Sequence, residues 1–152
     1  MRELTLLEIL DEAFRNARDL DAPLARRLES FADNVRATSP EFADAVDRLI
    51  YRLQQTGTGN GAPKVGEQLP EFELPGSEGH LVTLHQLVET GPVALTFHRG
   101  HWCPYCRINT KALADLQCRI LPQGAQVVAI TPETSRYPPF SNRSTKPLPS
   151  AS

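Results

Sequence analysis

The stretch HRGHWCPYC at residues 98–106 decides the fold of this 152-residue chain. It follows an apolar run at 93–97 (VALTF), which predicts a buried strand covered on both faces. It precedes the segment 104–121, where apolar side chains recur at helical spacing. A second apolar run at 126–131 (QVVAIT) predicts another buried strand. Strand, helix and strand in this order predict a right-handed βαβ unit.

Two cysteines of this stretch, Cys103 and Cys106, have the Cys-x-x-Cys spacing of a redox pair. Cys103 is expected at the N-terminus of the helix, where unpaired backbone N–H groups and the helix dipole stabilise an anion. Pro104 suits the first helical position because its missing N–H would have no partner there. We therefore predict a lowered pKa for Cys103, with Arg99 and Arg107 adding positive charge. Cys106 is expected to be the less exposed thiol and close enough for a disulfide.

The same pair allows two other interpretations. One is a zinc site, because His98, His101 and the two cysteines supply four nitrogen and sulfur ligands, although structural zinc sites usually draw their ligands from two separated knuckles. The other is a pair of cysteines without chemistry. The position between a strand and a helix favours thiol redox chemistry over both. Cys118 lies about 18 Å of helix beyond Cys106, too far for a disulfide, and is expected to be an inert or interfacial thiol.

Residues 1–55 form a different kind of sequence. They contain no glycine, and their apolar side chains recur at helical spacing with charged residues between them. This pattern predicts three short amphipathic helices, each with one narrow apolar stripe, as a helical N-terminal extension. Pro23 and Pro40 are expected at first helical positions, with Ser39 as an N-cap.

The rest of the chain divides at changes of composition. Residues 56–63 (TGTGNGAP) have nothing to bury and are interpreted as a linker. Short alternating runs at 72–74 and 81–84 predict a β-hairpin, so that residues 64–133 form one partial domain. Residues 134–152 are rich in proline and serine and are expected to be a disordered tail that can be removed without loss of stability.

Composition excludes several classes of function. The net charge is −2 without a long basic run, which argues against nucleic acid or an anionic membrane as a partner. The chain has no apolar run long enough to span a membrane and no apolar core of a secretory signal. Three cysteines are too few for a disulfide scaffold and fit a reducing compartment. We therefore expect a cytoplasmic protein.

Residues 64–133 resemble the alkyl hydroperoxide reductases and thiol-specific antioxidants, the peroxiredoxins of the thioredoxin-like superfamily. The matching elements are Val65-Gly66, Pro70-Glu71-Phe72-Glu73-Leu74, Val82-Thr83-Leu84, GPVALTF at 91–97, RGHWCPYC at 99–106 and VAITPE at 128–133. The chain is most similar to the branch with an N-terminal helical extension and a W-C-P-Y-C site that includes Trp102. The resemblance implies an α/β fold, an incomplete thioredoxin-like domain with a helical extension.

The resemblance also implies a chemistry. The Cys103 thiolate would attack the O–O bond of hydrogen peroxide or an organic hydroperoxide, and Cys106 would condense with the resulting sulfenic acid. Thioredoxin or a similar dithiol would reduce the disulfide, and no metal or organic cofactor is needed. Arg99, Trp102, Pro104 and Arg107 would support the pair. The alternatives are a protein disulfide oxidoreductase and an inactive family member that acts only through interactions.

The sequence also departs from the family pattern. Gly100 stands where the family's peroxide-binding loop has threonine, and Thr96 where it has proline. The family's arginine beyond the second strand has no counterpart, which leaves Arg99 or Arg107 as its substitute. Residues 134–152 read as unrelated to the family, as if the domain were truncated. The missing elements would leave a sheet edge open, so we expect self-association into a homo-oligomer or coverage of that edge by the N-terminal helices.

Overall fold

The computed structural model describes residues 5–133. The chain forms two compact units that divide between Leu69 and Pro70, and each unit is described by itself. The expected disordered tail at 134–152 lies outside the described residues. Among the helices of the described part, none is both long and apolar enough to cross a membrane.

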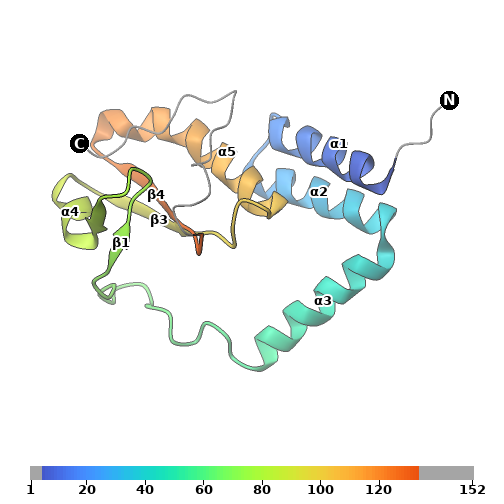
Figure 1. Cartoon of the computed structure of the whole chain (residues 1–152), viewed down its shortest axis with the longest axis horizontal. Helices are drawn as coiled ribbons and strands as arrows, with labels where there is room; N and C mark the ends of the chain where they lie inside the picture. The colour runs from blue at the N-terminus through green and yellow to red at the C-terminus, as the bar shows by residue number, and fades with distance from the viewer. Residues whose placement is uncertain (1–4, 134–152) are drawn as a thin grey trace. The chain divides into compact units, whose positions relative to one another are not determined.

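The N-terminal unit contains the three expected helices, α1 (Leu6–Asp19), α2 (Leu24–Thr38) and α3 (Pro40–Gln55) (Figure 1). Thr5 caps α1: its hydroxyl accepts the Glu8 N–H, and the Glu8 carboxylate accepts the Thr5 N–H at 2.8 Å. α1 and α2 lie side by side, and the rings of Phe14 and Phe31 meet edge to face with centroids 6.4 Å apart. The apolar stripes of α1 and α2 therefore form the small core of this unit.

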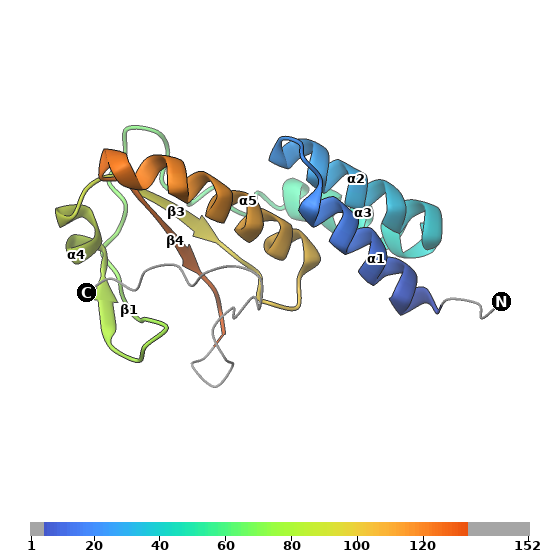
Figure 2. The same cartoon turned by 90° about the horizontal axis from the view of Figure 1, so that it is seen from above.

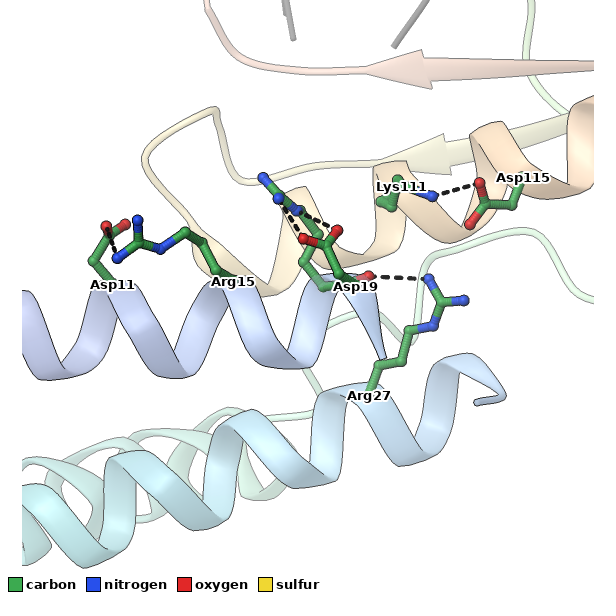
Figure 3. Close-up of polar contacts among 7 residues, drawn as sticks. Asp11, Arg15, Asp19, Arg27, Lys111 and Asp115 are labelled. Carbon is green, nitrogen blue, oxygen red and sulfur yellow. Dashed lines mark hydrogen bonds and ion pairs between the residues drawn. The ribbon is translucent and has the colours of Figure 1, made fainter. Parts of the chain in front are cut away.

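Arginine side chains reinforce the helical unit. Arg27 of α2 donates from Nη1 to the carbonyl oxygen of Arg18 on α1 at 3.1 Å (Figure 3). Arg36 of α2 pairs with Asp47 of α3 at 2.7 Å. α3 contributes only Ala43 to the buried residues, so most of its apolar stripe stays exposed.

Pro40 begins α3 as expected, but Pro23 does not begin α2. Pro23 has ψ of 150°, an extended value, so it occupies the N-cap position and α2 starts at Leu24. The Pro23 carbonyl oxygen accepts the N–H groups of Arg26 and Arg27, as an N-cap carbonyl does. Ser39 takes the N-cap position of α3, although its side chain makes no capping hydrogen bond.

The C-terminal unit begins with the expected hairpin. Strands β1 (Glu73–Pro75) and β2 (Leu81–Thr83) pair in antiparallel fashion. The short helix α4 (Leu84–Glu89) follows directly and was not expected from the sequence. Its signal was present, because Thr83 and Gln86 form a capping box at Thr-x-x-Gln spacing.

The expected βαβ unit follows. Strand β3 (Val93–Phe97) leads to α5 (Pro104–Ile120), the short 3₁₀ helix η1 (Leu121–Gln123) and strand β4 (Gln126–Ile130). β3 and β4 pair in parallel, with Val93 opposite Gln126 and Phe97 opposite Ile130. α5 runs along this two-stranded sheet (Figure 2).

The expectation that β3 is buried on both faces is wrong for the residues described. Thr96 faces α5, where Asn109 Nδ2 donates to its hydroxyl at 3.4 Å. Phe97 points to the opposite face, because side chains alternate along a strand, and it is 70% exposed. α5 therefore covers one face of this sheet.

Two glycines set the start of both strands. Gly91 has φ of +139°, and a Cβ built there would lie 2.1 Å from the carbonyl oxygen of Gly124. Gln126, the first residue of β4, continues the contact between the two segments, because its N–H donates to the Pro92 carbonyl at 2.9 Å. Gln126 Nε2 also donates to the Leu87 carbonyl at 2.7 Å. The close approach of Gly91 to Gly124 therefore helps to fix the register in which β3 and β4 pair.

We predict that Gly91→Ala lowers the free energy of unfolding by at least about 2 kcal/mol more than Gly79→Ala. Both glycines have positive φ, so both alanines are strained, but nothing lies within 4 Å of a Cβ at Gly79. Urea unfolding followed by circular dichroism measures the two losses. Equal losses would contradict the role given to the Gly91–Gly124 contact.

Candidate active site

The cysteine pair lies where β3 turns into α5. Cys103 occupies the N-cap position and Pro104 the first helical position. The Cys103 N–H donates to the Gly100 carbonyl at 3.1 Å, and its own carbonyl accepts the Arg107 N–H at 3.1 Å. Both Cys103 and Cys106 are free thiols in this structure. The first thiol therefore has the position at the helix N-terminus that the sequence predicted.

The order of burial is the reverse of the one expected. Cys103 is 0% exposed and Cys106 is 8% exposed, although Cys106 was predicted to be the more buried thiol. The reason is the connecting loop at 98–103, which turns back at Gly100 with φ of +134° and brings Arg99 against the Cys103 sulfur. The position of each cysteine along α5 takes no account of this loop, so the sequence did not predict that Cys103 is the more buried thiol.

Arg99 joins the two sulfur atoms. Its Nη2 donates to Cys103 Sγ at 3.0 Å, and its backbone N–H donates to Cys106 Sγ at 3.3 Å. Its Cζ lies 5.5 Å from the centre of the Trp102 ring, within the range of a cation–π contact. Arg99 thus contacts both thiols and the Trp102 ring.

Opposing effects act on the first thiol. Burial raises the pKa of Cys103, but hydrogen bonding from the Cys106 backbone and thiol and from the Arg99 guanidinium lowers it by more. The pKa of Cys103 is therefore below its ordinary value, the direction predicted from the sequence. The same hydrogen bond to Cys103 raises the pKa of Arg99.

The four candidate zinc ligands do not gather. His98 is buried, with Nε2 3.4 Å from Asn109 Nδ2 and Nδ1 3.5 Å from the Thr110 hydroxyl. Burial lowers the pKa of His98, which favours its neutral form. His101 pairs with Glu133 instead. Within residues 5–133, no three His, Cys, Asp or Glu side chains form a group able to hold a metal ion.

Two further residues, Cys118 and Glu133, lie apart from the cysteine pair. Cys118 is exposed near the C-terminal end of α5, a turn beyond the Lys111–Asp115 ion pair of 2.6 Å (Figure 3). Glu133, which the sequence analysis did not include in the site, follows β4 and contacts His101 of the 98–103 loop. Parallel pairing could have revealed Glu133, because the carboxyl ends of two parallel neighbours meet at one edge.

We predict that Arg99→Met slows alkylation of Cys103 at neutral pH by about tenfold, the effect of one pH unit in the thiol pKa. The guanidinium favours the thiolate, so its loss raises the Cys103 pKa and moves the alkylation profile to higher pH. Iodoacetamide labelling across a pH series, with the labelled cysteine identified by mass spectrometry, measures this. Arg119→Met, on the exposed last turn of α5, is the matched control. An unchanged profile in Arg99→Met would contradict the assignment.

Comparison with known proteins places this site in a family. The model of the AhpC/TSA family matches residues 65–146, more than half of the chain. The match includes residues 134–146, so this part of the C-terminal segment is not unrelated to the family, contrary to expectation. No curated protein and no solved structure gave a significant match. Because the family match contains the hairpin, the βαβ unit and both cysteines of the pair, the chain belongs to the AhpC/TSA family and has a thioredoxin-like α/β fold with an N-terminal helical extension.

Proposed function

We propose that this protein is a thiol-dependent peroxidase that reduces hydrogen peroxide or organic hydroperoxides through Cys103 and Cys106. Membership of the AhpC/TSA family implies redox chemistry of the peroxiredoxin or thioredoxin-like kind. The observation that carries the finer proposal is the contact of Arg99 Nη2 with Cys103 Sγ at 3.0 Å. A guanidinium at this distance stabilises a thiolate, and the thiolate is the nucleophile.

The proposed reaction has three steps. The Cys103 thiolate attacks one peroxide oxygen, so an S–O bond forms, the O–O bond breaks, and the leaving oxygen takes a proton as water or an alcohol. The sulfur is oxidised to a sulfenic acid as the peroxide is reduced. The Cys106 sulfur then attacks the Cys103 sulfur, and an S–S bond forms as water leaves. Thioredoxin or another dithiol reduces this disulfide through a mixed disulfide, which suits a reducing compartment such as the cytoplasm.

The burial of Cys103 supports a small substrate. Its sulfur is covered in the structure, while reaction with a protein disulfide requires that the attacking sulfur meet a sulfur of a folded partner. Hydrogen peroxide needs a much narrower opening than a folded partner does. This difference in size favours a peroxide over a protein disulfide as the first oxidant of the covered thiol, and the later reaction with thioredoxin requires the loop at 98–103 to uncover one sulfur of the disulfide.

One observation favours the second candidate, a protein disulfide oxidoreductase. Gly100 lies in the loop before Cys103 and has no hydroxyl with which to hold a peroxide. Two assays separate the candidates: consumption of hydrogen peroxide with thioredoxin and its reductase, and reduction of insulin disulfides by the reduced protein. Activity in the insulin assay alone would replace the peroxidase proposal with the oxidoreductase.

We predict that Cys103→Ser abolishes peroxide consumption, while Cys106→Ser keeps the first attack and loses the disulfide. The helix N-terminus and Arg99 favour the Cys103 thiolate, and Cys106 lies one turn further along α5. After one equivalent of peroxide, mass spectrometry should find sulfenic or sulfinic acid on Cys103 of the Cys106→Ser variant. Cys118→Ser is the control and should react as the unchanged protein does. Oxidation of Cys106 at equal rate in the Cys103→Ser variant would reverse the assignment.

We also propose self-association, since β3 and β4 pair only with each other among residues 5–133. Unpaired strand edges favour pairing with the same edge of a second copy. Sedimentation velocity over a concentration series should show a dimer or larger species, reduced by a charge in Phe97→Lys beside the edge. A compact monomer at every concentration would contradict this proposal.

A further inference from the structure

The Glu133 carboxylate connects the segment after β4 to the loop at 98–103. Its Oε1 accepts the His101 backbone N–H at 2.7 Å and also contacts His101 Nδ1. Its Oε2 accepts the Thr131 hydroxyl at 2.8 Å, and the Glu133 side chain is only 16% exposed. The backbone hydrogen bond from His101 lowers the pKa of Glu133, so this carboxyl is charged at neutral pH. A charged acceptor makes these hydrogen bonds stronger than neutral ones.

The segment that Glu133 holds is the loop at 98–103, which begins at the end of β3. The loop is fixed at its start, because the His98 N–H donates to the Ile130 carbonyl at 2.8 Å. It turns at Gly100, where an added Cβ would lie 2.6 Å from Trp102 Nε1 and 3.2 Å from Glu133 Oε1. Trp102 Nε1 and Glu133 Oε1 therefore both lie against Gly100, on the side where another residue would carry its side chain.

The same loop also contacts the two thiols. Arg99 precedes the Gly100 turn and Trp102 follows it, and the Arg99 guanidinium lies over the Trp102 ring. The turn therefore sets where the Arg99 guanidinium can reach. In the structure it reaches Cys103 Sγ, while the Arg99 N–H reaches Cys106 Sγ.

We infer that Glu133 is a positioning residue for the reactive thiol: by holding His101 it fixes the turn at Gly100 and so keeps Arg99 against Cys103. Glu133 acts through the loop and not by touching the sulfur. The titratable and charged groups that face this arrangement are His101 and Arg99 of the loop and Cys103 and Cys106 of α5. The inference deepens the proposed function and rests on Cys103 as its nucleophile, whichever oxidant that thiol attacks.

The sign of the effect separates positioning from charge alone. A carboxylate near a thiol disfavours the thiolate, so loss of a purely electrostatic Glu133 would lower the pKa of Cys103 and speed its alkylation. Loss of a positioning Glu133 releases Arg99, raises the pKa of Cys103 and slows its alkylation. The two roles therefore predict changes in opposite directions.

The test is iodoacetamide labelling of Cys103 across a pH series, which needs no peroxide and no reductant. We expect Glu133→Ala to slow labelling at neutral pH by about fivefold to tenfold, the range of a change approaching one pH unit in the thiol pKa. Glu133→Gln keeps an oxygen that can accept the His101 N–H and should have a smaller effect. Faster or unchanged labelling in Glu133→Ala would overturn the inference.

Two controls complete the design. Glu89→Ala removes the carboxylate of another His–Glu pair, His85 Nε2 to Glu89 Oε1 at 3.1 Å on α4, and should leave the labelling unchanged. In an Arg99→Met background, Glu133→Ala should have no further effect, because a residue that acts through another gives non-additive changes. Additive effects would overturn the inference even if each single variant labels slowly.

Circular dichroism shows which variants are folded, and Glu133→Gln is the variant to compare if Glu133→Ala is not folded. If labelling behaves as expected and peroxide is not consumed, the proposed function fails while the positioning role stands.

Discussion

The parallel pairing of β3 with β4 is the constraint on which the site depends. Because both strands end at the same edge of the sheet, the loop after β3 and the residues after β4 emerge side by side. One of these segments carries Arg99 and leads to Cys103, and the other carries Glu133. The start of the pairing is set in turn by Gly91 and Gly124, whose backbones approach too closely for a side chain. A shift in this register would separate His101 from Glu133.

The lowered pKa of Cys103 comes from a balance between burial and charge. Burial favours the neutral thiol, since a thiolate loses its hydration in the protein interior. The helix N-terminus, the Cys106 groups and the Arg99 guanidinium act in the other direction, and together they lower the Cys103 pKa. The same burial limits what can reach the sulfur. One arrangement thus combines a covered thiol with a lowered pKa.

The polar side chains near the sheet divide into two groups with different roles. One group is a part-buried network between β3 and α5, where the side chains contact one another: Thr96, His98, Asn109 and Thr110. His101 and Glu133 lie at the end of the sheet and tie the loop to the segment after β4. The histidines at 98 and 101 are therefore not equivalent, although they lie three residues apart in a stretch that also suggested zinc ligation.

The sequence by itself determined the local structure and the kind of chemistry. Helical and alternating apolar spacing predicted α1, α2, α3, the hairpin and the βαβ unit, because these periods depend on near neighbours in the chain. The Cys-x-x-Cys spacing beside Pro104 predicted which thiol has the lowered pKa, since a helix N-terminus is also a local feature. The contact of the Arg99 guanidinium with Cys103 Sγ depended on the path of the loop. The greater burial of Cys103 depended on the same loop. The contact of His101 with Glu133, 32 residues further on, depended on the pairing of β3 with β4. Contacts between segments distant in sequence arise only when the strands pair, and only the tertiary structure decided them.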